Sequence, residues 1–181
     1  MKKLGFVFNG ARCTGCGACV VACKEEKGVP DGVWLRKRYE NVHDFNYITQ
    51  GCNHCDDPAC ASVCPVKAYH KDADGLVIQD HAKCIGCGAC QGACPWHVPS
   101  FSKTEKKMYK CDACAPRLAK GLKPACVAAC PMGAIEFGPI EELRAKYPDA
   151  EEKGWAWAKK EFGYAGPTLT HPNLVIVPLK S

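Results

Sequence analysis

Sixteen cysteines, about one residue in eleven of this 181-residue chain, are the side chains best able to do chemistry. They form four groups of four, and every group ends in a Cys-x3-Cys step. Thiolates are soft ligands that select zinc, copper(I) or iron–sulfur clusters. The groups are Cys13, Cys16, Cys19 and Cys23; Cys52, Cys55, Cys60 and Cys64; Cys84, Cys87, Cys90 and Cys94; and Cys111, Cys114, Cys126 and Cys130.

Three interpretations of these cysteines compete. Disulfide scaffolds usually belong to short secreted chains, and cysteines spaced by two residues cannot all find partners at disulfide geometry. Structural zinc sites usually take two separated Cys-x2–4-Cys pairs. The third group, "CIGCGACQGACP" at 84–95, instead has the bacterial ferredoxin spacing with its final proline. We therefore interpret the cysteines as iron–sulfur ligands, with structural zinc as the main alternative.

The same spacing predicts how each group is used. Three thiols on a loop bind three iron corners of one cluster, and Gly86 and Gly88 permit the tight backbone. A helical turn after Cys90 then carries Cys94, and in two-cluster ferredoxins this fourth cysteine binds the neighbouring cluster. Clusters are therefore expected in pairs that exchange one ligand.

The pairing of the groups follows from the segments between them. Groups two and three flank two predicted strands, at 66–70 and 76–79, around the turn residues Asp74-Gly75. Loop, helix, hairpin, loop and helix make the ferredoxin core, so these groups are expected to share a module. By elimination, groups one and four form the other module. The predicted strands 4–9 and 133–138 could complete that module by pairing in a small sheet. Pairing one with two and three with four is the alternative.

This pairing assigns every cysteine to one of four [4Fe–4S] clusters. The predicted ligands are Cys13, Cys16, Cys19 and Cys130 for cluster 1; Cys111, Cys114, Cys126 and Cys23 for cluster 2; Cys52, Cys55, Cys60 and Cys94 for cluster 3; and Cys84, Cys87, Cys90 and Cys64 for cluster 4.

The expected fold class is α+β, with two interleaved bacterial-type 2[4Fe–4S] ferredoxin modules and a mixed C-terminal tail. Residues 1–51 and 96–140 would form the outer module, with a long insertion at 24–51. Residues 52–95 would form the inserted module, and 141–181 a tail that docks a partner.

The tail itself carries no cysteine. Helices are predicted over 140–147 and from "DAEE" at 149–152, and "LVIVPL" at 174–179 predicts a strand. Trp155 and Trp157 are two residues apart and cannot share one helix face. One could pack inward while the other meets a partner.

Charge and motifs exclude several classes of function. The formal net charge is +5, but four [4Fe–4S] clusters with their thiolates add about −8 and leave about −3. The excess Lys and Arg thus compensate buried cofactors, and no nucleic-acid partner is expected. Dinucleotide and phosphate-loop fingerprints are missing from the sequence, and all cysteines are assigned to clusters. The chain is expected not to be catalytic by itself.

Some other residues near the cysteines could have a role. His54 and His97 could tune a cluster or relay a proton, although a structural or surface position is the preferred interpretation. Lys83 and Lys110 each precede a cysteine and could raise a cluster potential or be ordinary solvated lysines. The basic patch 36–38 could contact a partner or screen a cluster, with a solvated strand edge preferred.

The chain also resembles a known family over nearly its whole length. The four groups in order, together with "CNHCDDPAC", "CDACAPRLAKGLKPACVAACP", "FGPIEELR" and "HPNLVIVP", resemble the four-cluster iron–sulfur subunits of the dimethyl sulfoxide reductase family of molybdenum or tungsten oxidoreductases. Within the family the similarity is greatest to the dimethyl sulfoxide reductase members. All sixteen thiols are present, so four complete clusters are expected.

The resemblance implies an electron-transfer subunit and its partners. These would be a large molybdenum or tungsten pterin catalytic subunit and an integral-membrane subunit that reacts with quinone. It also supports the pairing of groups one with four and two with three. The sequence shows no export signal of its own, so the expected place is peripheral at the cytoplasmic membrane, on the extracytoplasmic side if exported with a partner, or the cytoplasm. A free-standing polyferredoxin shuttle is the alternative function.

Overall fold

Short helices and strands alternate with the cysteine loops along the chain, for which a computed structural model describes residues 2–179. In chain order the elements are β1 (Leu4–Asn9), α1 (Ala18–Lys27), β2 (Lys37–Asn41), β3 (Asn46–Gln50), α2 (Ala59–Ser62), β4 (Tyr69–Lys71), β5 (Val77–Gln79), α3 (Ala89–Ala93), β6 (Ser100–Ser102), β7 (Lys107–Tyr109), α4 (Ala115–Leu118), α5 (Ala125–Ala128), β8 (Ile135–Pro139), α6 (Ile140–Lys146), α7 (Ala150–Phe162) and β9 (Leu174–Val177).

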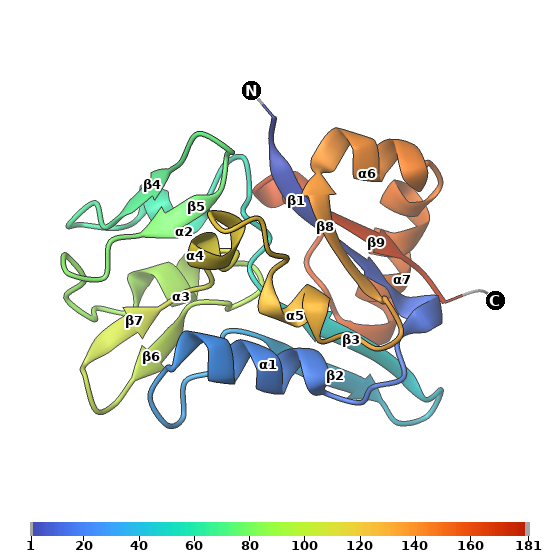
Figure 1. Ribbon diagram of the computed structural model, residues 1–181, viewed down its shortest axis with the longest axis horizontal. Coiled ribbons are helices and arrows are strands. Elements are labelled where there is room, and N and C mark those ends of the chain that lie inside the picture. The colour runs from blue at the N-terminus through green and yellow to red at the C-terminus, as the bar shows by residue number, and fades with distance from the viewer. Residues whose placement is uncertain (1, 180–181) are drawn as a thin grey trace.

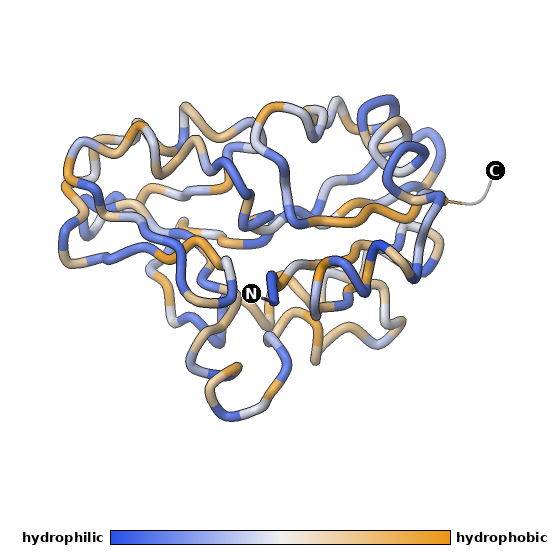
Figure 2. Tube along the Cα trace, turned by 90° about the horizontal axis from the view of Figure 1, so that it is seen from above, coloured by the Kyte–Doolittle hydropathy of each residue, from blue (hydrophilic) through white to orange (hydrophobic). Residues whose placement is uncertain are grey.

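A three-stranded sheet in the order β8-β1-β9 joins the two ends of the chain (Figure 1). β1 pairs antiparallel with β8, with Phe6 opposite Phe137, and parallel with β9, with Phe6 opposite Leu174. The predicted strands at 4–9, 133–138 and 174–179 are confirmed within a few residues. Because β1 is the central strand and is covered by side chains, nearly all of it is buried, as expected for a continuous apolar run. The strand near the C-terminus is likewise hydrophobic along its length (Figure 2).

Helices α6 and α7 cover this sheet and confirm the two helices predicted in the tail. α7 lies so close to β9 that a Cβ on Gly154 would stand 1.6 Å from the carbonyl oxygen of Ile176. Only glycine fits there. Trp155 is buried against Trp96 and Tyr164, with ring centroids 6.0 and 6.2 Å away. The tail is therefore part of the protein core.

Trp157, on the other face of α7, is half-buried. Its ring meets Phe162 edge-on, with the centroids 5.4 Å apart. Both tryptophans thus pack on their own chain, whereas the sequence analysis allowed one of them to contact a partner.

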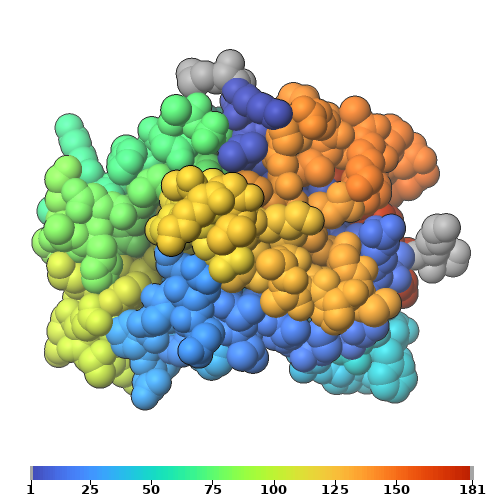
Figure 3. Space-filling view, in the orientation of Figure 1, coloured from blue at the N-terminus to red at the C-terminus, as the bar shows by residue number. Residues whose placement is uncertain are grey.

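Within residues 2–179, two helix pairs and three hairpins complete the fold. α1 packs against α5, and α2 packs against α3. The predicted hairpin after group two is confirmed as β4–β5, with Tyr69 opposite Gln79. The surface of α4 lies between the green β4–β5 region and the blue α1 (Figure 3). None of the helices within 2–179 has the length and apolar character needed to span a bilayer.

The hairpins β2–β3 and β6–β7 were not predicted from the sequence. β2–β3 occupies the insertion 24–51. β6–β7 follows residue 95, yet it contacts the segment 52–95: Gln79 Nε2 donates to the carbonyl oxygen of Met108 at 2.8 Å, and Lys107 Nζ to that of His81 at 3.0 Å.

Candidate metal centres

The cysteines gather in four places, which we call sites 1 to 4. Three sites are hollows of about 340 Å³ (site 1), 380 Å³ (site 3) and 280 Å³ (site 4). At site 2 the thiols lie near enough to raise one another's pKa. The cysteines are Cys13, Cys16, Cys19 and Cys130 at site 1; Cys23, Cys111, Cys114 and Cys126 at site 2; Cys52, Cys55, Cys60 and Cys94 at site 3; and Cys64, Cys84, Cys87 and Cys90 at site 4. These are the four sets derived from the sequence.

The helix pairs explain why distant cysteines meet. α1 carries Cys19 and Cys23, and its partner α5 carries Cys126. α2 carries Cys60 and its partner α3 carries Cys90. α1 runs from site 1 to site 2. In α2, α3 and α5 the cysteine on the helix and the one just beyond its end (Cys64, Cys94 and Cys130) belong to different sites.

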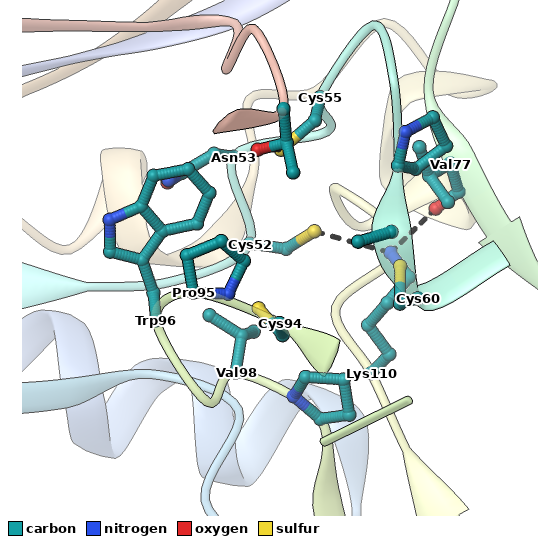
Figure 4. A pocket seen from close by; sticks show the side chains of 14 residues that line it. Cys52, Asn53, Cys55, Cys60, Val77, Cys94, Pro95, Trp96, Val98 and Lys110 are labelled. Carbon is teal, nitrogen blue, oxygen red and sulfur yellow. Dashed lines mark hydrogen bonds between the residues drawn. The ribbon is translucent and has the colours of Figure 1, made fainter. Parts of the chain in front are cut away.

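The shape of the hollows fits a cluster. In Figure 4 four thiols stand around the hollow of site 3, with Trp96, Pro95 and Val98 forming apolar walls. A zinc ion would need four sulfurs about 2.3 Å from one point. Within 2–179, no three Cys, His, Asp or Glu side chains converge on such a point. A wider iron–sulfide core supplies one-electron redox chemistry when it is bound there.

Hydrogen-bond donors point at cysteine sulfur atoms in several sites. The hydroxyl of Thr170, in the tail, donates to Cys55 Sγ at 3.2 Å. Backbone N–H groups also donate: Met108 to Cys84 at 3.3 Å, Ala68 to Cys64 at 3.3 Å, Ala134 to Cys130 at 3.2 Å, Ala113 to Cys111 at 3.3 Å and His54 to Cys52 at 3.4 Å. Such donors stabilise negative charge on the sulfur and therefore raise cluster potentials.

Burial disfavours free thiolates at these sites. Burial, followed by the influence of neighbouring thiolates, raises the pKa of Cys23, Cys55 and Cys60 to about 12. Without metal these thiols stay protonated at neutral pH. Iron must displace the protons to bind, so loading the sites releases protons.

Two buried cations lie among the cysteines. Arg36 donates from Nη1 to Thr49 Oγ1 at 2.9 Å. Burial opposes its charge, but thiolates, chiefly Cys126 and Cys19, outweigh this and raise the pKa of Arg36 above its ordinary value. The preferred interpretation of a solvated strand edge is therefore wrong for Arg36. Arg38 is exposed, but its Nη1 donates to the carbonyl oxygen of Gly15, in the loop of group one, at 3.0 Å.

The second buried cation is Lys110. Burial would lower its pKa, but the thiolates of Cys52, Cys111 and Cys60 outweigh that effect, so the pKa of Lys110 is raised. Lys83 behaves differently: it is exposed and pairs with Asp80 at 3.4 Å.

The two candidate histidines take structural or surface positions. His54 is fully buried, and its Nδ1 accepts the N–H of Val77 at 3.1 Å. Burial, and then the charges of Lys110 and Lys71, lower the pKa of His54 well below its usual value, so the ring is neutral with its proton on Nε2. His97 is exposed, and its Nδ1 lies 3.1 Å from the carbonyl oxygen of Gln91.

The sites form a series with exposed ends. Burial, and then neighbouring thiolates that include Cys52 of site 3, raise the pKa of Cys111 of site 2, and Lys110 contacts both residues. Cys16 at site 1 and Cys87 at site 4 are exposed. Apolar side chains stand open beside them, Met132 at site 1 and Ile85 at site 4.

Comparisons with known proteins agree with this chemistry. Residues 43–140 match a family described as "4Fe-4S dicluster domain", and residues 12–68 match a second family of the same description. The B subunit of the anaerobic dimethyl sulfoxide reductase of Haemophilus influenzae is 41% identical, covering 99% of this chain and 91% of the relative. The B subunit of the Escherichia coli enzyme is 44% identical, covering 97% and 89%.

A third relative comes from another reductase. The polysulfide reductase B subunit of Wolinella succinogenes is 35% identical, covering 99% of this chain and 96% of its own length. The dicluster matches and the sixteen cysteines mean that the protein binds four [4Fe–4S] clusters. The chain therefore belongs to the family of iron–sulfur electron-transfer subunits that includes the B subunits of the dimethyl sulfoxide and polysulfide reductases.

Proposed function

We propose that this chain, not catalytic by itself, relays single electrons through its clusters in the order site 1, site 2, site 3, site 4, or in reverse. The partners would be a large molybdenum or tungsten pterin catalytic subunit and an integral-membrane quinone-reactive subunit or another redox protein. The contact of sites 2 and 3 through Cys52, Lys110 and Cys111 is the observation that carries the proposal, because it joins two pairs of sites into one series.

We further propose that sites 1 to 4 hold clusters 1 to 4 with the ligands derived from the sequence. Groups one and four would then form the outer module and groups two and three the inserted one. The shared hollows of sites 1, 3 and 4 support these ligand sets. The β6–β7 hairpin supports extending the inserted module from 95 to about 109, since Met108 binds Cys84.

The proposed setting is a complex held at the cytoplasmic membrane, on the extracytoplasmic side if the chain is exported with its partner. Relatives named as B subunits of reductases support a complex.

A free-standing polyferredoxin shuttle is the second candidate. Exposed apolar residues around site 4, Ile85, Val63 and Phe101, favour a docked subunit because such side chains gather at interfaces. The part of the tail that the structure describes packs on its own chain through α7 and β9. Its docking role stays a prediction.

Single Cys→Ser replacements test the ligand sets. The full chain with its clusters is titrated reductively, and each cluster is followed by electron paramagnetic resonance. Cys64→Ser and Cys87→Ser are expected to change the same cluster, and Cys16→Ser a different one. If Cys64→Ser and Cys16→Ser instead change one common cluster, groups one and two share a module and the proposed order is wrong.

A further inference from the structure

Lys110 is a cation enclosed between two of the four sites. It follows β7, and only 7% of its surface is exposed. Its Nζ donates to Cys52 Sγ at 3.3 Å, to the carbonyl oxygen of Val77 at 2.6 Å and to that of Cys111 at 2.7 Å; the first two bonds are drawn in Figure 4. An ammonium group has three N–H donors, so these acceptors use all of them.

The acceptors also identify the partner of the positive charge. Two are neutral carbonyl groups, and only the Cys52 sulfur can carry a negative charge. Lys110 therefore shares its charge with a ligand sulfur of site 3, while its own backbone continues into Cys111 of site 2. The hydrogen bonds to Val77 on β5 and to Cys111 hold the ammonium group in this place.

We propose that Lys110 sets the reduction potential of the cluster held by Cys52 and Cys55, and with it the driving force for electrons crossing between sites 3 and 2. An electron that crosses oxidises one of these two clusters and reduces the other. Reduction adds a negative charge, which a fixed cation and its N–H donor favour, so Lys110 raises the potential. The effect decreases with distance, so site 3 is affected most.

This inference rests on the proposed relay but not on the pairing of the cysteine groups. Cys52 and Cys55 belong to the same group and share a cluster under either pairing. A failure of the pairing test therefore leaves the prediction for Lys110 unchanged.

Lys83 provides a matched control. Like Lys110 it immediately precedes the first cysteine of a group, here Cys84. Its side chain is 61% exposed, however, and its ion pair is with Asp80. The two lysines are therefore equally close in sequence to a cysteine, but they differ in burial and in contact with sulfur.

The test compares Lys110→Met with Lys83→Met in the full cluster-loaded chain. Methionine keeps the length of the buried stem and removes the charge. Reductive titration with paramagnetic resonance detection gives each midpoint potential. Thr170→Val removes the hydroxyl that donates to Cys55, so the cluster whose potential it shifts is the site 3 cluster. This identification does not depend on turnover.

We expect Lys110→Met to shift the one-electron equilibrium of that cluster at least tenfold toward the oxidised form, which is a fall of about 59 mV. Lys83→Met should leave all four potentials unchanged. Equal effects of both variants, or no shift at the cluster marked by Thr170→Val, would overturn the proposal.

Two more variants test the proposal if Lys110→Met fails to bind its clusters. Lys110→Arg keeps the charge and Lys110→Gln removes it while keeping N–H donors. The expected result is a potential near the wild type for arginine and a lowered one for glutamine. Equal potentials, or neutral variants that cannot form the site 3 cluster at all, would refute a tuning role.

Discussion

Replacing Gly86 by alanine is expected to remove the cluster at site 4, and replacing Gly88 is not. Both glycines lie in the loop of group three, and both have left-handed backbone, with φ of 71° and 77°. They differ in their surroundings. A Cβ on Gly86 would stand 1.9 Å from the carbonyl oxygen of Lys106, whereas one on Gly88 would meet nothing within 4 Å.

The magnitude follows from this contrast. An L-residue in left-handed backbone costs about 1–2 kcal/mol, which applies to both variants. Real Cβ atoms essentially never approach closer than 3.0 Å, so in Gly86→Ala the β6–β7 hairpin must also retreat by about 1 Å. That movement stretches the bond from the Met108 N–H to Cys84 Sγ, and a hydrogen bond to a charged group contributes about 1.5–3 kcal/mol. The total for Gly86→Ala is about 2.5–5 kcal/mol.

Iron and acid-labile sulfide content is the assay, supported by the denaturant midpoint under anaerobic conditions. Gly88→Ala should keep about 16 iron atoms per chain with a slightly lower midpoint, and Gly86→Ala should fall to about 12. The reasoning is refuted if Gly86→Ala holds all its iron and unfolds at the same denaturant concentration as Gly88→Ala, because the hairpin would then yield without cost.

Two further predictions concern site 3 and the exposed surface. Thr170→Val should lower the potential of the site 3 cluster by less than the fall of about 59 mV expected for Lys110→Met, since an uncharged O–H donor is lost while the buried cation stays. Thr168→Val, at an exposed position, is the control, and a fall of equal size there would contradict the assignment. The double variant Ile85→Ser with Phe101→Ser should reduce co-purification of a reductase partner while the iron content stays constant. Val42→Ser, in the β2–β3 loop and about as exposed as Ile85, should not reduce it. Retention of the partner by the double variant would favour a shuttle or another docking face.

Local pattern predicted much of this fold and of its sites. The cysteine spacing gave the four groups, and the apolar runs gave β1, β8 and β9, because these signals lie within a few residues. Thr170 was missed because 115 positions separate it from Cys55, and no periodic pattern connects the two.

For Arg36 the sequence offered contact with a cluster as one interpretation of the patch 36–38, but it favoured a solvated strand edge. In a run of three basic residues, nothing local shows that the first is buried beside thiolates and the third is exposed. Lys110 was singled out by its position before a cysteine, as Lys83 was, but sequence alone could not separate the buried lysine from the solvated one.

The position of β1 at the centre of its sheet has a consequence for biosynthesis. β1 leaves the ribosome well before its partners β8 and β9, which end at Pro139 and Val177. At about 5–20 residues per second, an apolar strand remains without neighbours for roughly 10–30 s. The β4–β5 hairpin can form much earlier from adjacent residues. We therefore expect β1 of the nascent chain to need a chaperone or another shield until β8 and β9 have been synthesised.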